Sequence, residues 1–381
     1  MVLHIGPMKT GTTYVQNLLE ENRDVLREQG WAVPRQPLVV RGVRQVLGLT
    51  DAGQEALDHT PDWDELSRRV REHDGRGALL SMEFLSYAGR PAVARVLEGL
   101  RGTDVHVVLT VRDAAGALPS QWQSLSRNGG ILSWPEFATE IRSAGPRDKG
   151  RAIKQYRRTQ DVPRMLETWA RAVPRERLTV VTVPPSSAPR SLLWERLLSV
   201  AGIDPATTST VETAFGNPQL GYGSCELLRR LNAAGLHGAR PSAYRRVVRH
   251  VARNYLLPLR DDQSKPRLDR GTAEFAAAAN AATRRVIEKR ATLVGDLDDL
   301  PVRPPAEGLD PGDRPRQAPD EEVRRAADAA LAGTLAYCAA HDVTLPTGTP
   351  RELRGDVGEA IEQVAALMRV AMSGDPSHDE S

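Results

Sequence analysis

The residues whose types and spacing are best suited to chemistry lie near the start of the chain, at positions 2–13, with the sequence VLHIGPMKTGTT. A short apolar run precedes a turn with two glycines and a proline, and apolar residues at helical spacing follow. This order predicts a strand, a tight loop and the first turn of a helix. Such a loop directs several backbone N–H groups into one concavity, where the helix dipole adds partial positive charge. Lys9 adds a full charge and three threonines add hydroxyl donors, so the segment predicts a site for a phosphate or sulfate group.

The position of the lysine separates two kinds of anion loop. In a Walker A loop, G-x-x-x-x-G-K-[ST], lysine directly follows the second glycine. Gly6 and Gly11 keep that spacing, but Thr12 occupies the lysine position, and Lys9 lies inside the loop. A nucleoside triphosphate with magnesium favours lysine at the helix start and a Ser or Thr on the metal. The pattern therefore favours a ligand whose bridging oxygen is stabilised without a metal. A P-loop kinase or NTPase that uses ATP and magnesium is the alternative, and a non-catalytic binding protein on the same scaffold is a further one.

A second candidate anion contact follows the clearest predicted strand, at residues 104–111. Arg112 comes directly after this strand, and Ser120 lies eight residues further on, in a predicted helix. Open α/β sheets bind ligands at the carboxyl ends of their strands. A guanidinium and a hydroxyl at this spacing can hold one phosphate between them. A surface ion pair of Arg112 is the competing interpretation.

The two segments together resemble the sulfotransferases that use PAPS (3′-phosphoadenosine 5′-phosphosulfate), in their divergent bacterial form. Residues 7–13, PMKTGTT, are similar to the family's 5′-phosphosulfate loop, whose usual form is P-K-[ST]-G-T-T, with Met8 as one extra residue. Arg112 and Ser120 match the R-D-x6-S spacing of its 3′-phosphate motif. The resemblance covers about residues 1–295. It implies PAPS as co-substrate, no metal, and transfer of a sulfuryl group to a hydroxyl of a carbohydrate or small metabolite.

The resemblance also implies roles for individual residues. Lys9 would be catalytic, because it can neutralise the charge that develops on the bridging oxygen. The loop residues expected to bind the 5′-phosphosulfate are Lys9, Thr10, Gly11, Thr12 and Thr13. The 3′-phosphate would be bound by Arg112 and Ser120.

A general base is also required, because the acceptor hydroxyl loses a proton as the new S–O bond forms. Glu83 follows the third predicted strand, at the sheet edge where Lys9 and Arg112 are also expected. Members of the family use either a histidine or a glutamate for this step. We expect Glu83 to be the base, and an ion pair with Lys9 or Arg112 is the competing interpretation. His4 is placed to orient the loop, and His106, inside a strand, is interpreted as a core histidine.

One part of the family pattern is missing. The usual C-terminal segment R-K-G-x-x-G-D-W, which completes the 3′-phosphate site, is absent from this sequence. An arginine-rich helical stretch can replace it, bind an anionic acceptor or form a solvated cationic face; its members are Arg240, Arg245, Arg246, Arg249 and Arg253. The acceptor pocket is expected to be built from residues 35–61, 125–160 and 205–260, and the sequence does not identify the acceptor.

The alternation of short apolar runs with helical patterns predicts an α/β fold of the P-loop type, with three layers and a central parallel sheet flanked by helices. Strands are predicted at residues 2–5, 31–34, 77–82, 104–111 and 178–183. Among the helices predicted between and after them are residues 12–29, 62–74, 91–100, 135–142, 162–173, 192–201, 224–234, 243–257, 272–294, 320–340 and 351–372. Residues 35–61 show no clean period, so we interpret them as an excursion from the fold.

These elements suggest an α/β domain at residues 1–295, a Pro-rich linker at 296–319, a helical extension at 320–372 and a disordered tail at 373–381. The last helix carries an apolar stripe formed by Val357, Ile361, Val364 and Met368. Packing within the chain is the favoured interpretation of this stripe, and a homo-oligomer through the C-terminal helices is the other.

Composition limits the classes of function. The 51 basic and 49 acidic residues leave a net charge of +2, from which no general affinity for polyanions follows. Aromatic residues make up 4% of the chain, which does not support a base-stacking surface for nucleic acid. Cys225 and Cys338 are too few and too distant for a zinc site or a disulfide framework. No stretch approaches the about 20 apolar residues of a membrane span. We therefore expect a cytoplasmic protein without a metal site.

Overall fold

The chain folds into two compact units, each assembled from segments that are distant in sequence. The structure is a computed structural model, and it describes residues 1–50, 59–210, 219–238 and 240–374. The first unit comprises Met1–Ala117, Lys149–Asn217 and Glu274–Pro304, and the second comprises Leu118–Asp148, Pro218–Ala273 and Pro305–Ser381. This division differs from the boundaries expected at residues 295 and 319, because residues 118–148 and 218–273 group with the C-terminal helices.

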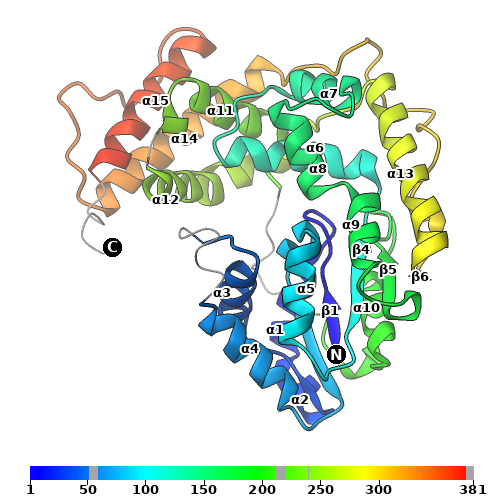
Figure 1. The fold of residues 1–381 in the computed structure, drawn as a ribbon. Coiled ribbons are helices and arrows are strands. Elements are labelled where there is room, and N and C mark those ends of the chain that lie inside the picture. The colour runs from blue at the N-terminus through cyan, green and yellow to red at the C-terminus, as the bar shows by residue number, and fades with distance from the viewer. Residues whose placement is uncertain (51–58, 211–218, 239, 375–381) are drawn as a thin grey trace. The chain divides into compact units, whose positions relative to one another are not determined.

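A parallel sheet of six strands lies at the centre of the first unit (Figure 1). The strands are β1 (Val2–His4), β2 (Trp31–Ala32), β3 (Gly77–Ser81), β4 (His106–Val111), β5 (Leu178–Thr182) and β6 (Thr292–Val294). Their order across the sheet is β2-β3-β1-β4-β5-β6. The predicted α/β class with a parallel sheet is confirmed. Because β3, β1 and β4 are neighbours, the residues that follow these three strands meet at one edge.

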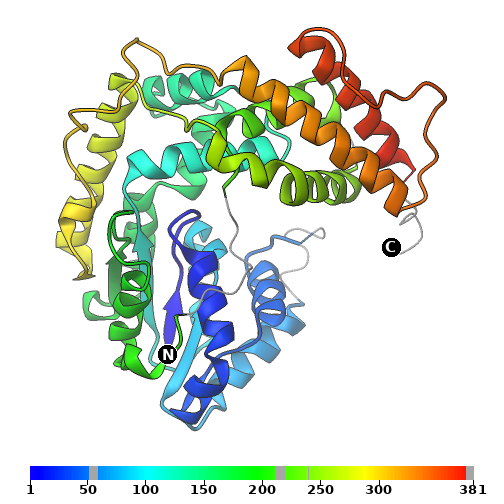
Figure 2. The ribbon, with the colours of Figure 1, turned by 180° about the vertical axis from the view of Figure 1, so that it is seen from behind.

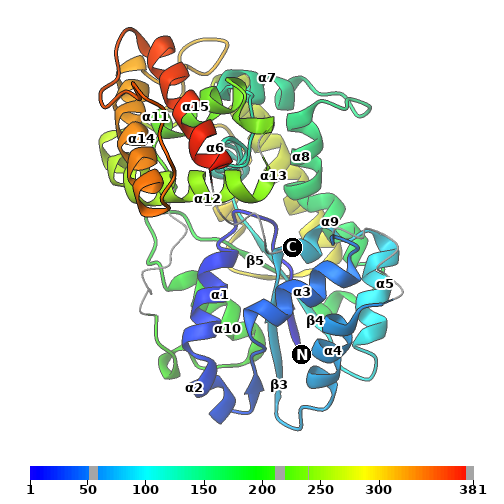
Figure 3. The same cartoon turned by 90° about the vertical axis from the view of Figure 1, so that its left-hand side faces the viewer.

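Helices cover both faces of this sheet, as Figure 3 shows. Strand side chains alternate between the faces, since successive residues of a strand point in opposite directions. One face packs against α3 (Gln36–Val46), α4 (Pro61–Arg71), α5 (Arg90–Gly99), α9 (Val162–Trp169) and α13 (Arg270–Arg290). The other face packs against α1 (Thr12–Glu21), α2 (Arg23–Glu28) and α10 (Leu192–Ala201). The expected three layers are therefore present.

The helix predicted at residues 12–29 is two helices, α1 and α2, separated at Asn22. The Asn22 amide donates to the Leu18 carbonyl and to the Ser209 carbonyl, both at 2.9 Å. Its side-chain oxygen accepts from the Ser209 N–H at 2.6 Å. The Asn22 side chain at the break between the helices is therefore hydrogen-bonded to a residue 187 positions away in sequence. No local sequence pattern indicates this break.

Three further expectations are corrected. The excursion expected at residues 35–61 contains the helix α3, whose Val39, Val43 and Val46 are buried; residues 51–58 lie outside the described part. A helix that was not predicted, α8 (Arg151–Thr159), precedes α9. The helix expected at residues 272–294 ends at Arg290, and β6 follows it as an edge strand. Two of the three β6 residues are exposed, so this strand has no buried apolar run by which to recognise it.

The second unit is helical in its described residues. It contains α7 (Trp134–Ser143), α11 (Tyr222–Ala233), α12 (Pro241–Val251), α14 (Asp320–Ala340), α15 (Val357–Ser373) and the last part of α6 (Ala114–Arg127). Figure 2 shows α14 and α15 side by side, in orange and red. The Glu322 carboxylate of α14 accepts from the Gly223 N–H at 3.3 Å and from the Ser264 N–H at 2.9 Å. Residues 320–372 are thus part of this unit and not a separate extension.

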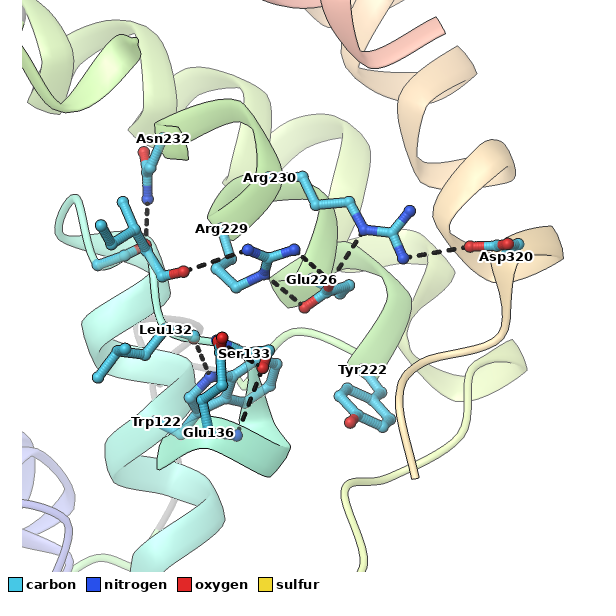
Figure 4. Close-up of polar contacts among 12 residues, drawn as sticks. Trp122, Leu132, Ser133, Glu136, Tyr222, Glu226, Arg229, Arg230, Asn232 and Asp320 are labelled. Atoms are coloured by element: carbon cyan, nitrogen blue, oxygen red, sulfur yellow. Dashed lines mark hydrogen bonds and ion pairs between the residues drawn. The ribbon is translucent and has the colours of Figure 1, made fainter. Parts of the chain in front are cut away.

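A buried carboxylate joins the helices of this unit (Figure 4). Glu226 of α11 is 2% exposed and pairs with Arg229 at 2.7 Å and with Arg230 at 2.9 Å. Arg230 also pairs with Asp320 at the start of α14, at 3.2 Å. Removing Glu226 would take this carboxylate from Arg229 and leave Arg230 with Asp320 alone, so the role of Glu226 is structural.

The apolar stripe of α15 packs within this unit, as favoured from the sequence. Ile361, Val364 and Met368 are buried, and Val357 is half-buried. Ser373, expected to begin the disordered tail, is the last residue of α15, and residues 375–381 of that tail lie outside the described part. In the described residues, no helix combines the length and the apolar character that crossing a bilayer requires.

Candidate functional site

The three residues expected to carry the chemistry follow three neighbouring strands of the first unit. Lys9 follows β1, Glu83 follows β3 and Arg112 follows β4. Nη1 of Arg112 lies 3.5 Å from the carbonyl oxygen of Lys9. The Gln16 amide of α1 donates to Oε2 of Glu83 at 3.0 Å. The structure therefore places the loop, the guanidinium and the carboxylate at one edge of the sheet.

The helix that follows the loop begins without a side-chain cap. Gly11 occupies the cap position with φ 84°, and neither a capping side chain nor an acidic residue is found in the first turn of α1. The first N–H groups of a helix have no partner within it, and the positive end of the helix dipole lies there. Thr13, in this first turn, is exposed. The start of α1 is thus suited to an anion.

A chain of buried hydrogen bonds lies beneath the loop. The Thr10 hydroxyl donates to the Pro7 carbonyl and contacts the Thr110 hydroxyl, both at 2.7 Å. Thr110 also contacts Nε2 of His4 at 3.0 Å, and Nδ1 of His4 contacts the Ser81 hydroxyl at 2.8 Å. Since Thr10 gives its proton to Pro7, Thr110 donates to Thr10 and therefore accepts from Nε2 of His4. This assigns the Nε2–H tautomer and makes Ser81 the donor to Nδ1.

The ionisation of His4 agrees with this assignment. Burial lowers the pKa of His4 to about 4, because the imidazolium would lose its hydration. A neutral ring has one donor and one acceptor nitrogen, as the network requires. His4 therefore positions the loop, as the sequence suggested, and at neutral pH it carries no charge.

Two of the loop threonines face inward. Thr10 is 1% exposed and its hydroxyl is used twice, by Pro7 and Thr110. Thr12 is also buried, with its hydroxyl 3.4 Å from the Pro7 carbonyl. The expectation that the Thr10 hydroxyl donates to a ligand is therefore not met, and its hydroxyl instead closes the turn. Thr13 is the loop threonine that faces solvent.

Arg112 is partly buried, and in the part of the chain that the structure describes no carboxylate forms an ion pair with it. Its guanidinium lies against Gly116, where a Cβ would approach Nη2 to 3.1 Å. Burial lowers the pKa of Arg112, and the nearby Asp113 charge raises it in part. The surface ion pair considered from the sequence is thus not formed with any residue that the structure describes. A desolvated cation without a bonded counter-charge favours an anionic ligand.

The Asp113 carboxylate is used by the protein itself. Its Oδ1 accepts from the Ala115 N–H at 3.0 Å and from the Asn280 amide at 2.7 Å. Asn280 in turn accepts from the Ala114 N–H at 3.0 Å. The start of α6 therefore has side-chain partners from the chain, in contrast to the start of α1, and Arg112 is the group left for an anion after β4.

Ser120 belongs to the second unit, so its expected pairing with Arg112 stays a prediction. It is 4% exposed and accepts a hydrogen bond from the Gln219 amide.

The surroundings of Glu83 combine polar and aromatic groups. Glu83 begins a short helical turn, η2 (Glu83–Tyr87), and Tyr87 ends it. The Arg158 guanidinium lies 5.2 Å from the centre of the Tyr87 ring. Burial raises the pKa of Tyr87, and the Glu83 charge adds to this effect. A carboxylate that accepts one amide hydrogen bond and is partly exposed can receive a proton from a bound hydroxyl.

Gln160 is a residue of this site that sequence reasoning missed. It is 8% exposed and donates to the carbonyl oxygen of Met8 at 2.7 Å, across 152 residues. Met8 is the extra residue of the loop, so Gln160 fixes the turn where the chain departs from the usual pattern. A lone glutamine after a basic helix carries no signal by which it could have been found.

Lys9 has a strained backbone, and relieving the strain gives a testable difference. Its φ is 71°, in the left-handed region, which costs a non-glycine residue roughly 1–2 kcal/mol. We expect Lys9→Gly to be more stable than Lys9→Ala by about 1 kcal/mol in chemical denaturation, because only glycine relieves the strain. Asp342, with φ 52°, is the matched control, and Asp342→Gly should not affect anion binding. Equal free energies of unfolding for the two Lys9 variants would contradict the claim that the Lys9 backbone is strained.

Relatives of known function would offer an independent indication of what this arrangement does. Comparison of the chain with protein-family models, with curated proteins and with solved structures found no match.

Proposed function

We propose that this protein is a PAPS-dependent sulfotransferase that transfers a sulfuryl group to a hydroxyl of a carbohydrate or small metabolite and leaves PAP (adenosine 3′,5′-bisphosphate). The observation that carries the proposal is the pair of anion-seeking groups at adjacent strand ends. The uncapped start of α1 with Lys9 follows β1, and the Arg112 guanidinium follows β4 without an ion-pair partner among the described residues. A ligand with two separate anionic groups suits this pair.

The residues divide into two kinds of role. Lys9 and the N–H groups at the start of α1 would hold the 5′-phosphosulfate, and Arg112 would hold the 3′-phosphate. When bound, PAPS supplies the sulfuryl group, and its sulfur–oxygen bond to phosphate breaks as the bond to the acceptor oxygen forms. Lys9 would stabilise the negative charge left on the phosphate oxygen. Glu83 would receive the acceptor's proton.

Binding measurements distinguish this function from its alternatives. We expect titration calorimetry to show PAP binding without magnesium, and Lys9→Ala or Arg112→Ala to weaken it about 10- to 100-fold, as expected for loss of a charge-assisted hydrogen bond. Arg101→Ala is the matched control, because Arg101 pairs with Glu98 on the surface of the same unit. Preference for ATP with magnesium would indicate the kinase or NTPase. PAP binding without turnover on any acceptor would indicate the binding protein.

The role of Glu83 needs a separate test, once an acceptor is found with labelled sulfate donor. Glu83→Gln should leave PAP binding unchanged and lower kcat by about 10²- to 10⁴-fold, the usual contribution of a general base. Glu98→Gln is the control for removal of a surface carboxylate. Turnover that survives in Glu83→Gln would assign the base to another residue.

A further inference from the structure

The helix α8 exposes a row of cations in the first unit. Arg151, Lys154 and Arg158 lie at positions i, i+3 and i+7, on one side of the helix, and Lys149 precedes them. All four residues are exposed, whereas Ala152 and Ile153, on the other side of the helix, are buried. The sequence of α8, RAIKQYRRT, contains no acidic residue. We call Lys149, Arg151, Lys154 and Arg158 the α8 cationic face.

Several surface arginines on other helices of this unit pair with a carboxylate three or four residues away, as Arg68 does with Glu65 and Arg164 with Asp161. Within the described residues, none of the four cations of the α8 cationic face forms an ion pair. Like charges three or four residues apart destabilise a helix by about 0.2–0.5 kcal/mol per pair. In a chain with nearly balanced charge, this is a local excess.

The same helix contacts the candidate site. Gln160, the residue directly after α8, donates to the Met8 carbonyl of the loop at 2.7 Å. Arg158 lies over the ring of Tyr87, in the turn that Glu83 begins. Both contacts lie within the first unit. The α8 cationic face therefore adjoins the loop and the carboxylate.

We propose that the α8 cationic face binds an extended anionic carbohydrate polymer, one bearing carboxylate or sulfate groups, and that this polymer is the acceptor. Its role as acceptor rests on the proposed sulfotransferase function, whereas the contact itself does not. Arg151 to Arg158 spans roughly 10 Å at 1.5 Å per residue, enough to contact successive charged groups of such a chain. The acceptor hydroxyl would then lie near Glu83, at the end of this row.

Two other polyanions fit the face less well. A membrane surface would require an apolar face beside the charges, and that of α8 is buried in the unit. Single-stranded nucleic acid requires exposed aromatic rings for stacking. The one aromatic residue of α8, Tyr156, packs against Phe275 with ring centres 5.4 Å apart.

The test uses the full chain and polygalacturonate as the probe, with neutral dextran as the reference. We expect polygalacturonate to bind, with an affinity that falls as salt rises, and dextran not to bind. Arg151→Glu/Lys154→Glu/Arg158→Glu should weaken polygalacturonate binding by at least about 10-fold, because three attractive charges on the binding face become repulsive toward the polyanion. Because Arg158 also contacts Tyr87, Lys149→Glu/Arg151→Glu/Lys154→Glu is a second variant that leaves this contact intact.

The helix α13 offers a matched control. Arg285→Glu/Lys289→Glu reverses two exposed charges on a helix of the first unit and should change binding less than twofold. Absence of polygalacturonate binding, equal losses in the α8 and α13 variants, or stronger competition by single-stranded DNA than by polygalacturonate would each overturn the proposal. PAP calorimetry on the wild-type chain and on the α8 variants separates the proposed sulfotransferase function from the proposed polymer contact. Failure of the wild-type chain to bind PAP would remove the sulfotransferase function and leave the polymer contact standing.

Discussion

Gly6→Ala is expected to destabilise the first unit by about 3 kcal/mol or more, in the upper range for overpacking a core. A Cβ at this position would lie 2.0 Å from the Thr110 hydroxyl, 2.8 Å from Nε2 of His4 and 3.1 Å from the Thr10 hydroxyl. The Thr110 hydroxyl is hydrogen-bonded to each of the other two atoms, so none of the three can move without straining a buried hydrogen bond. Each such bond, once broken, leaves a polar group buried without a partner.

Calorimetric unfolding of Gly6→Ala, together with PAP titration, checks this expectation. Both the unfolding temperature and the affinity should fall, because the loop is built directly on the displaced atoms. Gly238→Ala is the control, since a Cβ there would have no neighbour within 4 Å among the described residues. A Gly6→Ala protein as stable as the wild type would show that the loop can lift away from the His4 network, and the positions given for Thr10 and Pro7 would then be wrong.

The local sequence pattern was sufficient to predict the main strands of the sheet. Strands β1, β3, β4 and β5 are buried apolar runs followed by polar or turn residues, and each was predicted within about two residues of its bounds. The ends of these strands then placed Lys9, Glu83 and Arg112 at one edge, because the carboxyl ends of parallel strands share an edge. Residues directly after buried parallel strands can therefore be placed from sequence.

Contacts between distant segments could not be predicted in this way. The Gln160 amide reaches Met8 across 152 residues, and Asn280 reaches Asp113 across 167. In neither case does the residue type or its spacing indicate the partner. The grouping of distant segments into the second unit could not be predicted for the same reason. Glu322, for example, accepts a hydrogen bond from the Gly223 N–H across 99 residues. The Thr10 hydroxyl donates to the Pro7 carbonyl and accepts from Thr110 of another strand, so it is not left to donate to a ligand as expected.

The stability of the first unit should fall as the pH is lowered from about 6.5 to about 4, through His4. The pKa of His4 is about 4 in the folded chain, lowered from its ordinary value of 6.5 by burial. Between these values the unfolded chain binds a proton at His4 and the folded chain does not, so the free energy of unfolding decreases as pH falls. Above pH 6.5 His4 is neutral in both states and contributes no pH dependence. Over the whole window the loss is on the order of 3 kcal/mol.

His4→Gln isolates this contribution, because other groups also titrate below pH 6. The variant should be less stable at pH 7, where it loses buried hydrogen bonds, but its stability should fall less steeply between pH 6.5 and pH 4. His59→Gln, at an exposed position of the same unit, should keep the slope of the wild type. Denaturant titrations at half-unit pH intervals measure these slopes. If His4→Gln and the wild type had parallel profiles, His4 would be protonated as easily in the folded chain as in the unfolded one. The neutral Nε2–H tautomer, and with it the direction of every hydrogen bond from Ser81 to Pro7, would then have to be abandoned.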